Sequence, residues 1–324
     1  MLTKRRGIVA ALASAFFLGM APVFGRQAIL LGISWQAVVA IRTLLAALLL
    51  LAVMAIFYRP FLFIYPAGLL GCLLAGWING LGSLFYYSAL SRIGAGLGQL
   101  LYSLYPLFLI LWLALDNQPP SRLTLLRLSM AVPAIILLAQ GHESKIDVVG
   151  IIMMLIASAL YALHLPFNQR VLVDMPAPTV TLYTLIAMSF VTLPIYLFSG
   201  FINIKLSDLS PINTAQELRY LWPLLGLTMV TFFSRLTLFM GVKHLGGMQT
   251  ALLGLSELLV TIIFAYVWLG ERFSLAQWIG ALLLIICLAL VGFEKQPPKR
   301  VSTGGFLSWL RPSGIPTDTW QPNE

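Results

Sequence analysis

The chain has 324 residues, of which 60% are hydrophobic and only 10% are charged, and its net charge is +9. Soluble domains carry about 25% charged residues, so a soluble globular fold is excluded because too few charges would be left to cover its surface. The basic residues are scattered singly between apolar runs and form no basic stripe with interleaved aromatics, so no nucleic-acid partner is expected.

Long apolar segments dominate the chain. A helix needs about 20 apolar residues to cross the hydrocarbon core of a bilayer. Ten windows of this kind follow one another, at roughly residues 7–31, 35–57, 64–89, 94–115, 122–140, 147–169, 178–200, 219–241, 247–269 and 274–293. The sequence therefore predicts an all-α integral membrane protein with ten transmembrane helices, and the mostly short connections make neighbouring helices antiparallel.

The two ends of the chain are expected to lie outside the membrane. The basic start Lys4-Arg5-Arg6 resembles a secretory signal, but the apolar run that follows extends beyond the roughly 15 residues of such a signal, which favours a first spanning helix. Residues 1–6 are then a cytoplasmic N-terminus, and the Pro-rich residues 294–324 are a disordered cytoplasmic tail.

The distribution of basic residues predicts the orientation. An even number of spans places both termini on one side, and a cytoplasmic start gives that side twelve Lys and Arg against six on the other. The positive-inside rule therefore favours two cytoplasmic termini, and the expected location is a bacterial inner membrane.

An internal repeat links the two halves of the sequence. An offset of 144 residues places Pro22 over Pro166 and Arg26 over Arg170, and an offset of 152 residues places Gly94 over Gly246. Each copy holds five helices, an odd number, so the second copy enters the membrane from the opposite side. Residues 7–140 and 147–293 are thus predicted to form two inverted five-helix repeats, which are typical of secondary transporters, although a duplicated protein without transport activity is the alternative.

Three ionisable residues fall at membrane depth, where a charge costs at least about 2.5 kcal/mol. Arg235 and Glu257 each lie eleven residues from Gly246, and Arg42 lies about ten residues from the turn near Gly32. At 1.5 Å rise per residue, Arg235 and Glu257 both reach a depth of roughly 16 Å. One interpretation is a buried ion pair of Arg235 and Glu257 that locks two helices together. The other is a site in which Glu257 binds a proton or the substrate, and Arg235 releases Glu257 during turnover. Two arginines against one glutamate leave a surplus positive charge at this depth, which favours an anionic group on the substrate.

Further candidates for the site are prolines and polar or aromatic residues within the spans. Pro22 and Pro166 each remove a backbone hydrogen bond, so helix breaks are expected there. His164, beside Pro166, is either a hydrogen-bonded packing residue or a ligand for the substrate. The remaining candidates either line the site or hold helices together, and they are Asn79, Tyr86, Tyr102, Tyr105 and Tyr161, with Gln99 as a further polar edge.

Motifs for enzymes, metals and cofactors are missing from the sequence. Cys72 and Cys287 both fall inside apolar segments, which indicates small packing groups instead of a disulfide or a metal site. The sequence contains no Gly-rich phosphate loop, zinc-binding motif or nucleophile elbow. No enzymatic activity, cofactor or metal is therefore expected.

Residues 7–293 resemble the EamA-type branch of the drug/metabolite transporter superfamily. The resemblance rests on the stretch Ala-Ile-Arg42-Thr-Leu-Leu-Ala-Ala-Leu, on Tyr105-Pro106-Leu107, and on Leu-Gly270-Glu271-Arg272-Phe-Ser. The chain departs from the family pattern in Leu115-Asp116-Asn117-Gln118, where Gly-Glu-Arg is usual, and in the absence of a proline after Glu257. The resemblance implies secondary transport, commonly export of amino acids or related metabolites, through a cavity between the halves.

The expected function is secondary active export of a small metabolite, such as an amino acid or other carboxylate, by alternating access. Protons are a candidate coupling ion, and a monomer or homodimer in membrane lipid is expected. One alternative is uptake or exchange of a nucleotide-linked or phosphorylated metabolite. An alternative of another class is a membrane-embedded enzyme or sensor that uses the same cavity.

Overall fold

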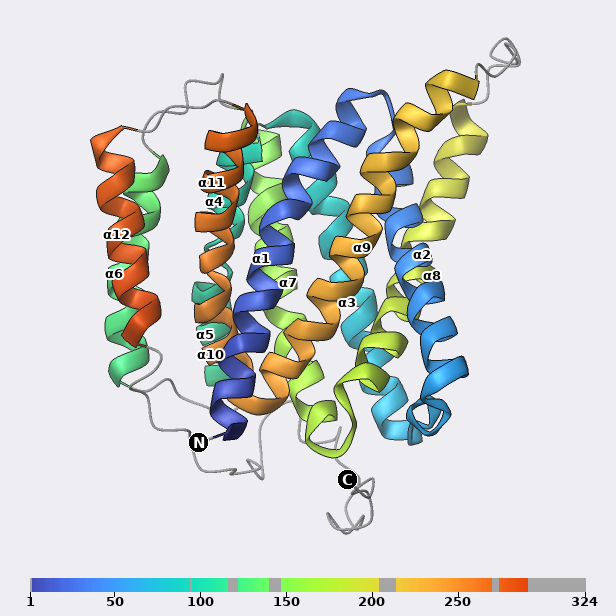
Figure 1. The fold of residues 1–324 in the computed structure, drawn as a ribbon, viewed down its shortest axis with the longest axis horizontal. Helices are drawn as coiled ribbons and strands as arrows, with labels where there is room; N and C mark the ends of the chain where they lie inside the picture. The colour runs from blue at the N-terminus through green and yellow to red at the C-terminus, as the bar shows by residue number, and fades with distance from the viewer. Residues whose placement is uncertain are drawn as a thin grey trace.

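The computed structural model describes residues 2–93, 95–115, 122–139, 147–203, 214–269 and 274–290. Every regular element in these ranges is a helix, and most of the helices run side by side along one direction (Figure 1). In chain order they are α1 (Leu2–Leu30), α2 (Trp35–Phe57), the short 3₁₀ helix η1 (Arg59–Leu62), α3 (Pro66–Arg92), α4 (Ala95–Tyr102), α5 (Tyr105–Leu115), α6 (Arg122–Ala139), α7 (Val148–Asp174), α8 (Ala177–Asn203), α9 (Thr214–Leu245), α10 (Gly247–Gly254), α11 (Ser256–Leu269) and α12 (Leu275–Ala289).

The helices follow the apolar windows of the sequence, with two differences. Six helices of the described ranges are long and apolar enough to cross a membrane, namely α1, α2, α3, α7, α8 and α9. The fourth and ninth windows each contain two shorter helices, α4 with α5 and α10 with α11. At the N-terminus, α1 already begins at Leu2, so residues 2–6 are helical and continuous with the first span. The predicted tail, residues 294–324, lies outside the described residues.

Local sequence signals explain where several helices begin. Ser34 precedes α2 and its hydroxyl accepts a hydrogen bond from the amide of Ala37 (3.3 Å). Asp147 caps α7 in the same way, through the amide of Gly150 (3.0 Å). The turns after α1 and α9 need a positive φ, which Gly32 and Gly246 adopt at 99° and 84°.

The two predicted helix breaks at Pro22 and Pro166 are wrong, because α1 and α7 continue through both prolines. The chain is interrupted instead at Ser103 and Leu104, between α4 and α5, and at Leu255, between α10 and α11. A helix tolerates one lost hydrogen bond when its neighbours still satisfy the backbone. Whether a break forms therefore depends on contacts from other helices.

Each observed break leaves a carbonyl that another helix satisfies. Pro106 has no N–H to bond the carbonyl of Tyr102, and the hydroxyl of Ser158 on α7 donates to that oxygen instead (3.0 Å). At the second break the amide of Leu255 donates to the carbonyl of Leu252 (3.2 Å), three residues earlier. In an α-helix it would donate to the carbonyl of Ala251, four residues earlier. The Tyr105 hydroxyl donates to the carbonyl of Ala251 that is left over (2.6 Å).

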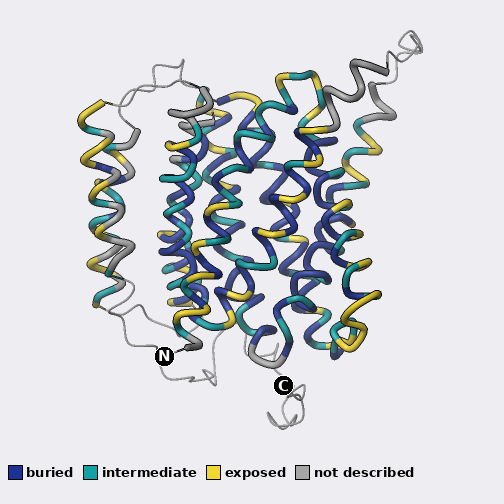
Figure 2. Tube along the Cα trace, in the orientation of Figure 1, coloured by how far each residue is buried: buried dark blue, intermediate teal, exposed yellow. Residues whose placement is uncertain are grey.

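Large apolar side chains cover the outside of the bundle, and its interior holds polar side chains as well as apolar ones. Phe57, Phe190 and Leu275 are each about 70% or more exposed, at 71%, 68% and 78%. Ser and Thr residues of α7, α8 and α9 are buried, and Figure 2 shows the buried residues concentrated in the middle of the bundle. Lipid is the solvent that suits such a surface, so the protein is an integral membrane protein.

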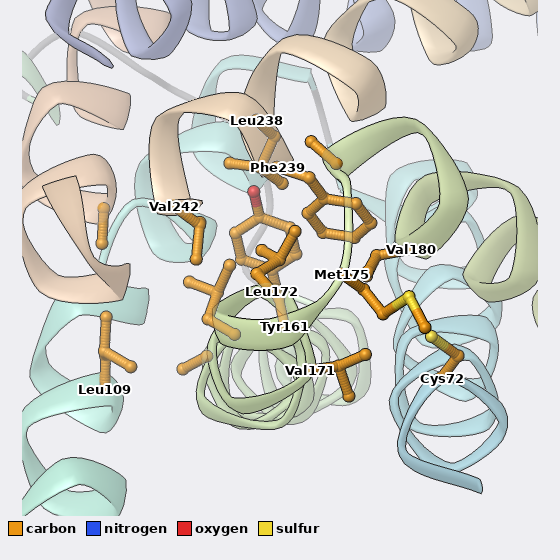
Figure 3. Packing of buried hydrophobic residues seen from close by; sticks show 14 of the residues in the cluster. Cys72, Leu109, Tyr161, Val171, Leu172, Met175, Val180, Leu238, Phe239 and Val242 are labelled. Atoms are coloured by element: carbon orange, nitrogen blue, oxygen red, sulfur yellow. The ribbon is translucent and has the colours of Figure 1, made fainter. Parts of the chain in front are cut away.

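Helices of the first half pack mainly against helices of the second half. α1 packs along α9, α3 along α7 and α8, α2 along α8, and α6 along α12. By their colours in Figure 1, α1 rises from the N-terminus while α7 runs in the opposite direction. Figure 3 shows one buried cluster in which Leu238, Phe239 and Val242 of α9 lie close to Tyr161 and Leu172 of α7, all in the second half. The first half contributes Cys72 and Leu109 to the same cluster.

Candidate functional site

The described residues bury three charged side chains, and all three are among the candidates from the sequence. Arg42 on α2, Arg235 on α9 and Glu257 in the first turn of α11 are 6%, 5% and 5% exposed. Two guanidinium groups against one carboxylate give this group a formal surplus of one positive charge. Such a surplus in a low-dielectric interior stabilises an incoming anion.

Glu257 is held by a neutral amide. Its Oε1 accepts a hydrogen bond from Nε2 of Gln99 on α4 (2.8 Å), and Oε1 of that amide accepts one from the Tyr86 hydroxyl on α3 (3.0 Å). Gln99 is only 1% exposed. Both polar ends of its side chain are therefore used inside the protein.

Arg235 faces a different partner. Its Nη2 lies 3.4 Å from the side-chain oxygen of Asn79 on α3, and its guanidinium lies 5.6 Å from the centre of the Tyr161 ring on α7. The only salt bridge within the described part of the chain joins Arg92 and Asp147 (3.5 Å). The interpretation of Arg235 and Glu257 as a direct ion pair therefore does not hold in this structure, although both lie in the same interior.

Arg42 extends the positive side of the site. Its Nη1 donates to the hydroxyl of Thr231 (3.2 Å), and its guanidinium lies 4.8 Å from the centre of the Tyr87 ring. Its Nε is buried and has no hydrogen-bond partner among the described residues. Thr231 and Arg235 are four residues apart, so one face of α9 contacts both parts of the site.

A chain of aromatic rings connects these groups. The ring centres of Tyr86 and Tyr102 lie 4.8 Å apart, those of Tyr102 and Tyr161 5.1 Å, and those of Tyr105 and Tyr161 5.0 Å. The Tyr86 and Tyr87 rings, 5.1 Å apart, bring the environment of Arg42 into the same chain. The rings offer an apolar body with hydroxyl edges, which suits a ligand of mixed polarity.

His164 lies at the end of this chain. Its ring centre is 4.8 Å from that of Tyr161, and its Nδ1 faces the carbonyl of Tyr161 one turn earlier. Its Nε2 is buried without a hydrogen-bond partner in the described ranges. Nδ1 thus contacts the backbone, whereas Nε2 is the ring nitrogen that could contact a ligand.

The structure connects all nine candidate residues, other than the prolines, in one network. Pro22 and Pro166 have no polar side-chain atom with which to join it. Sequence reasoning missed Tyr87 and Thr231, the partners of Arg42, and the role of Ser158. The position of Thr231 one helical turn before Arg235 was a usable signal, whereas nothing in the sequence connects Ser158 with Tyr102.

Metal and cysteine chemistry finds little support in the described residues. Within them no group of three or more His, Cys, Asp or Glu side chains could hold a metal ion. Cys72 is a buried free thiol on α3. The side chain of Cys287 lies outside what the structure describes.

Comparisons with known proteins give a family and a similar fold. A sequence model described as "EamA-like transporter family" matches residues 5–140 and again residues 148–293. No curated protein matches the chain. A solved structure titled only "Crystal structure of protein" superposes with a TM-score of 0.65 at 14% sequence identity, over 89% of this chain and 96% of its own. At that identity the likeness concerns the fold alone.

Proposed function

Because the chain belongs to the EamA-like transporter family, we propose that it is a secondary active transporter that exports a small metabolite bearing a carboxylate, such as an amino acid, by alternating access. The family match confirms the resemblance noted in the sequence and makes the chain a membrane transporter of the drug/metabolite type. The direction of transport, the substrate and the mechanism are parts of the proposal.

The first part of the proposal is the architecture: ten spans in two inverted repeats, with both termini in the cytoplasm of a bacterial cell and the protein in its inner membrane. Under the offset of 152 residues α4 coincides with α10, and both breaks fall at equivalent positions. The packing pairs are also mirrored, since α1 with α9 is the counterpart of α7 with α3. A reporter fused near residue 144, after the fifth predicted span, should lie outside the cell, and a cytoplasmic signal there would contradict the inversion.

The substrate class follows from the charges of the site. Two guanidinium groups and one carboxylate without a direct ion pair leave positive charge available, and this single observation carries the proposal. A substrate carboxylate would be held by Arg42, whose buried Nε is unpartnered among the described residues, and by Arg235. The aromatic rings between them would pack against the body of the substrate.

Glu257 is the proposed coupling group. A proton and the ammonium group of an amino acid would compete for the same carboxylate, and such competition exchanges one for the other. An inward proton gradient then drives the amino acid outward. Gln99, which is neutral, does not compete for the charge of Glu257 in the way that a direct arginine partner would.

Counterflow in vesicles tests the proposal. Purified protein is reconstituted in vesicles loaded with one of a panel of amino acids and small acids, and uptake of the radiolabelled compound is followed between pH 5.5 and 8.5. Glu257→Gln should abolish the pH dependence of counterflow, whereas Asp147→Asn, a carboxylate change outside the spans, should leave it in place. Unchanged pH dependence in Glu257→Gln would remove the coupling role, and no counterflow of any solute in the wild type would favour an enzyme or sensor.

A further inference from the structure

Two equivalent contacts join the broken helices across the interior. Tyr105, just after the first break, donates its hydroxyl to the carbonyl of Ala251 on α10 (2.6 Å). Glu257, just after the second break, accepts from the amide of Gln99 on α4 (2.8 Å). The same offset of 152 residues relates Tyr105 to Glu257 and Gln99 to Ala251. Each half-helix thus reaches the same position on the other copy, in a reciprocal pair of contacts.

The two contacts differ in their chemistry. The contact of Tyr105 is between a hydroxyl and a backbone carbonyl, so its strength does not depend on protonation in the physiological range. The contact of Gln99 is with a carboxylate, and a hydrogen bond to an ionised acceptor is roughly twice as strong as one between neutral groups. When Glu257 takes up a proton, only the second of the two contacts weakens.

The side chain of Gln99 is enclosed by protein. Its side chain is 1% exposed, and its amide oxygen is already occupied by the hydroxyl of Tyr86, which is 8% exposed. The hydroxyl of Ser103 bonds the backbone oxygen of Gln99 (2.7 Å) at the break itself. The amide is therefore fixed in orientation, with its NH₂ toward the carboxylate.

We propose that Gln99 is a positioning residue for Glu257, which sets the pH at which the carboxylate releases its proton and ties that event to the relative placement of α4 and α11. The inference rests on the proposed role of Glu257 in coupling. Gln99 acts through Glu257 and is not itself a group that binds the substrate. The sequence alone shows Gln99 only as a polar edge of the fourth span.

Replacing Gln99 by Met, which has a similar length and no N–H donor, tests the proposal. Loss of a donor to the carboxylate favours the protonated form, so Glu257 keeps its proton to higher pH. The pH midpoint of counterflow should then move upward by about 1 to 2 units, from the strength of hydrogen bonds to charged groups. Tyr86→Phe, which only frees the amide to turn, should move the midpoint in the same direction by less.

Gln169→Met is the matched control, because the Gln169 side chain also contacts α10, through the amide of Gly247 (2.9 Å), but does not touch Glu257. It should leave the midpoint unchanged. The pH titration of the Glu257 carboxyl band in the infrared spectrum of purified protein, identified by its loss in Glu257→Gln, gives the same midpoint without transport.

The outcomes separate the two proposals. An unchanged midpoint in Gln99→Met, while Glu257→Gln still abolishes pH dependence, overturns the role of Gln99 and leaves the proposed function intact. Loss of rate without a shifted midpoint is the result of a structural role and also overturns it. If Gln99→Met does not fold, the infrared titration of Tyr86→Phe decides, and a midpoint at the wild-type value counts against the proposal.

Discussion

Gly254 occupies a position that has no room for a side chain. A Cβ atom built on this last residue of α10 would overlap the hydroxyl oxygen of Tyr105 and lie 3.5 Å from the carbon that bears it. Tyr105 cannot swing aside easily, because it is 3% exposed and its ring lies 5.0 Å from that of Tyr161. Gly254→Ala should therefore displace the hydroxyl from the Ala251 carbonyl and destabilise the protein.

The change in the free energy of unfolding follows from two destabilising effects and one stabilising effect. Overpacking of a filled core costs about 1–3 kcal/mol. Loss of the buried hydrogen bond between Tyr105 and Ala251 adds about 0.5–1.5 kcal/mol. Replacing Gly by Ala in a helix returns about 1 kcal/mol of stability. The net destabilisation of Gly254→Ala is then expected near 2 kcal/mol, within a range of about 0.5–3.5 kcal/mol.

A double-mutant cycle with Tyr105→Phe isolates this contact, measured as the free energy of unfolding in detergent micelles. Phe keeps the ring and removes the oxygen that the new Cβ meets, so only the helix-propensity gain remains. Gly254→Ala should then stabilise that background by about 1 kcal/mol, with a coupling energy of about 3 kcal/mol. Gly98→Ala is the control on α4, since the nearest atom to its Cβ would be the end of the flexible Met154 side chain, at 3.0 Å, and Leu90 and Ile93 would lie at the ordinary contact distances of 3.7 and 3.8 Å. An equal cost of Gly254→Ala with and without the hydroxyl would refute the reasoning.

Two further predictions concern charged groups. In counterflow assays, Arg42→Gln should weaken competition by an unlabelled carboxylate substrate about 10- to 100-fold, from the strength of hydrogen bonds to charged groups. Competition by the amide of the same compound should weaken much less. Equal losses for the carboxylate and the amide would exclude a role for Arg42 in binding the carboxylate. At the N-terminus of α7, the amide of Gly150 and then the nearby Arg92 hold the pKa of Asp147 below its usual value, so its stabilising contribution is present above pH 4 and is lost as pH falls through that lowered pKa. Asp147→Ala should lower the thermal midpoint at pH 7 and narrow the difference between pH 7 and pH 3, and an unchanged difference would contradict this.

The sequence predicted the helices well where the signal was local. Apolar length located the spanning helices, and Gly32 and Gly246 marked the turns, because a positive φ favours glycine wherever the rest of the chain goes. The breaks were misplaced at Pro22 and Pro166 because a proline indicates only which hydrogen bond is missing. Whether the helix opens there depends on a distant partner such as Ser158, which no local pattern reveals.

The structure brings the candidate residues into one network of contacts, whereas the sequence did not predict which of them are paired. Equal distance from Gly246 placed Arg235 and Glu257 at one depth, but depth leaves the rotation of each helix about its axis undefined. The rotation turns Arg235 toward Asn79 and Glu257 toward Gln99. Since the partners lie on α3 and α4, pairing required the packing of both halves, which sequence spacing cannot supply.

The two broken helices reach the same geometry by different means, and the difference has a functional consequence. In the first copy Pro106 removes an N–H, so one helical hydrogen bond is lost at the break whatever the contacts are, whereas the equivalent position of the second copy is Leu258, which keeps its N–H. The second break therefore depends on tertiary contacts, among them the Tyr105 hydroxyl against Ala251 beside the small Gly254. A break without a proline can re-form its helical hydrogen bonds, whereas the N–H that Pro106 lacks cannot be restored. Glu257, the one carboxylate that the described residues bury, lies just after this second break, so the proposed coupling group lies beside the break whose helical hydrogen bonds can re-form.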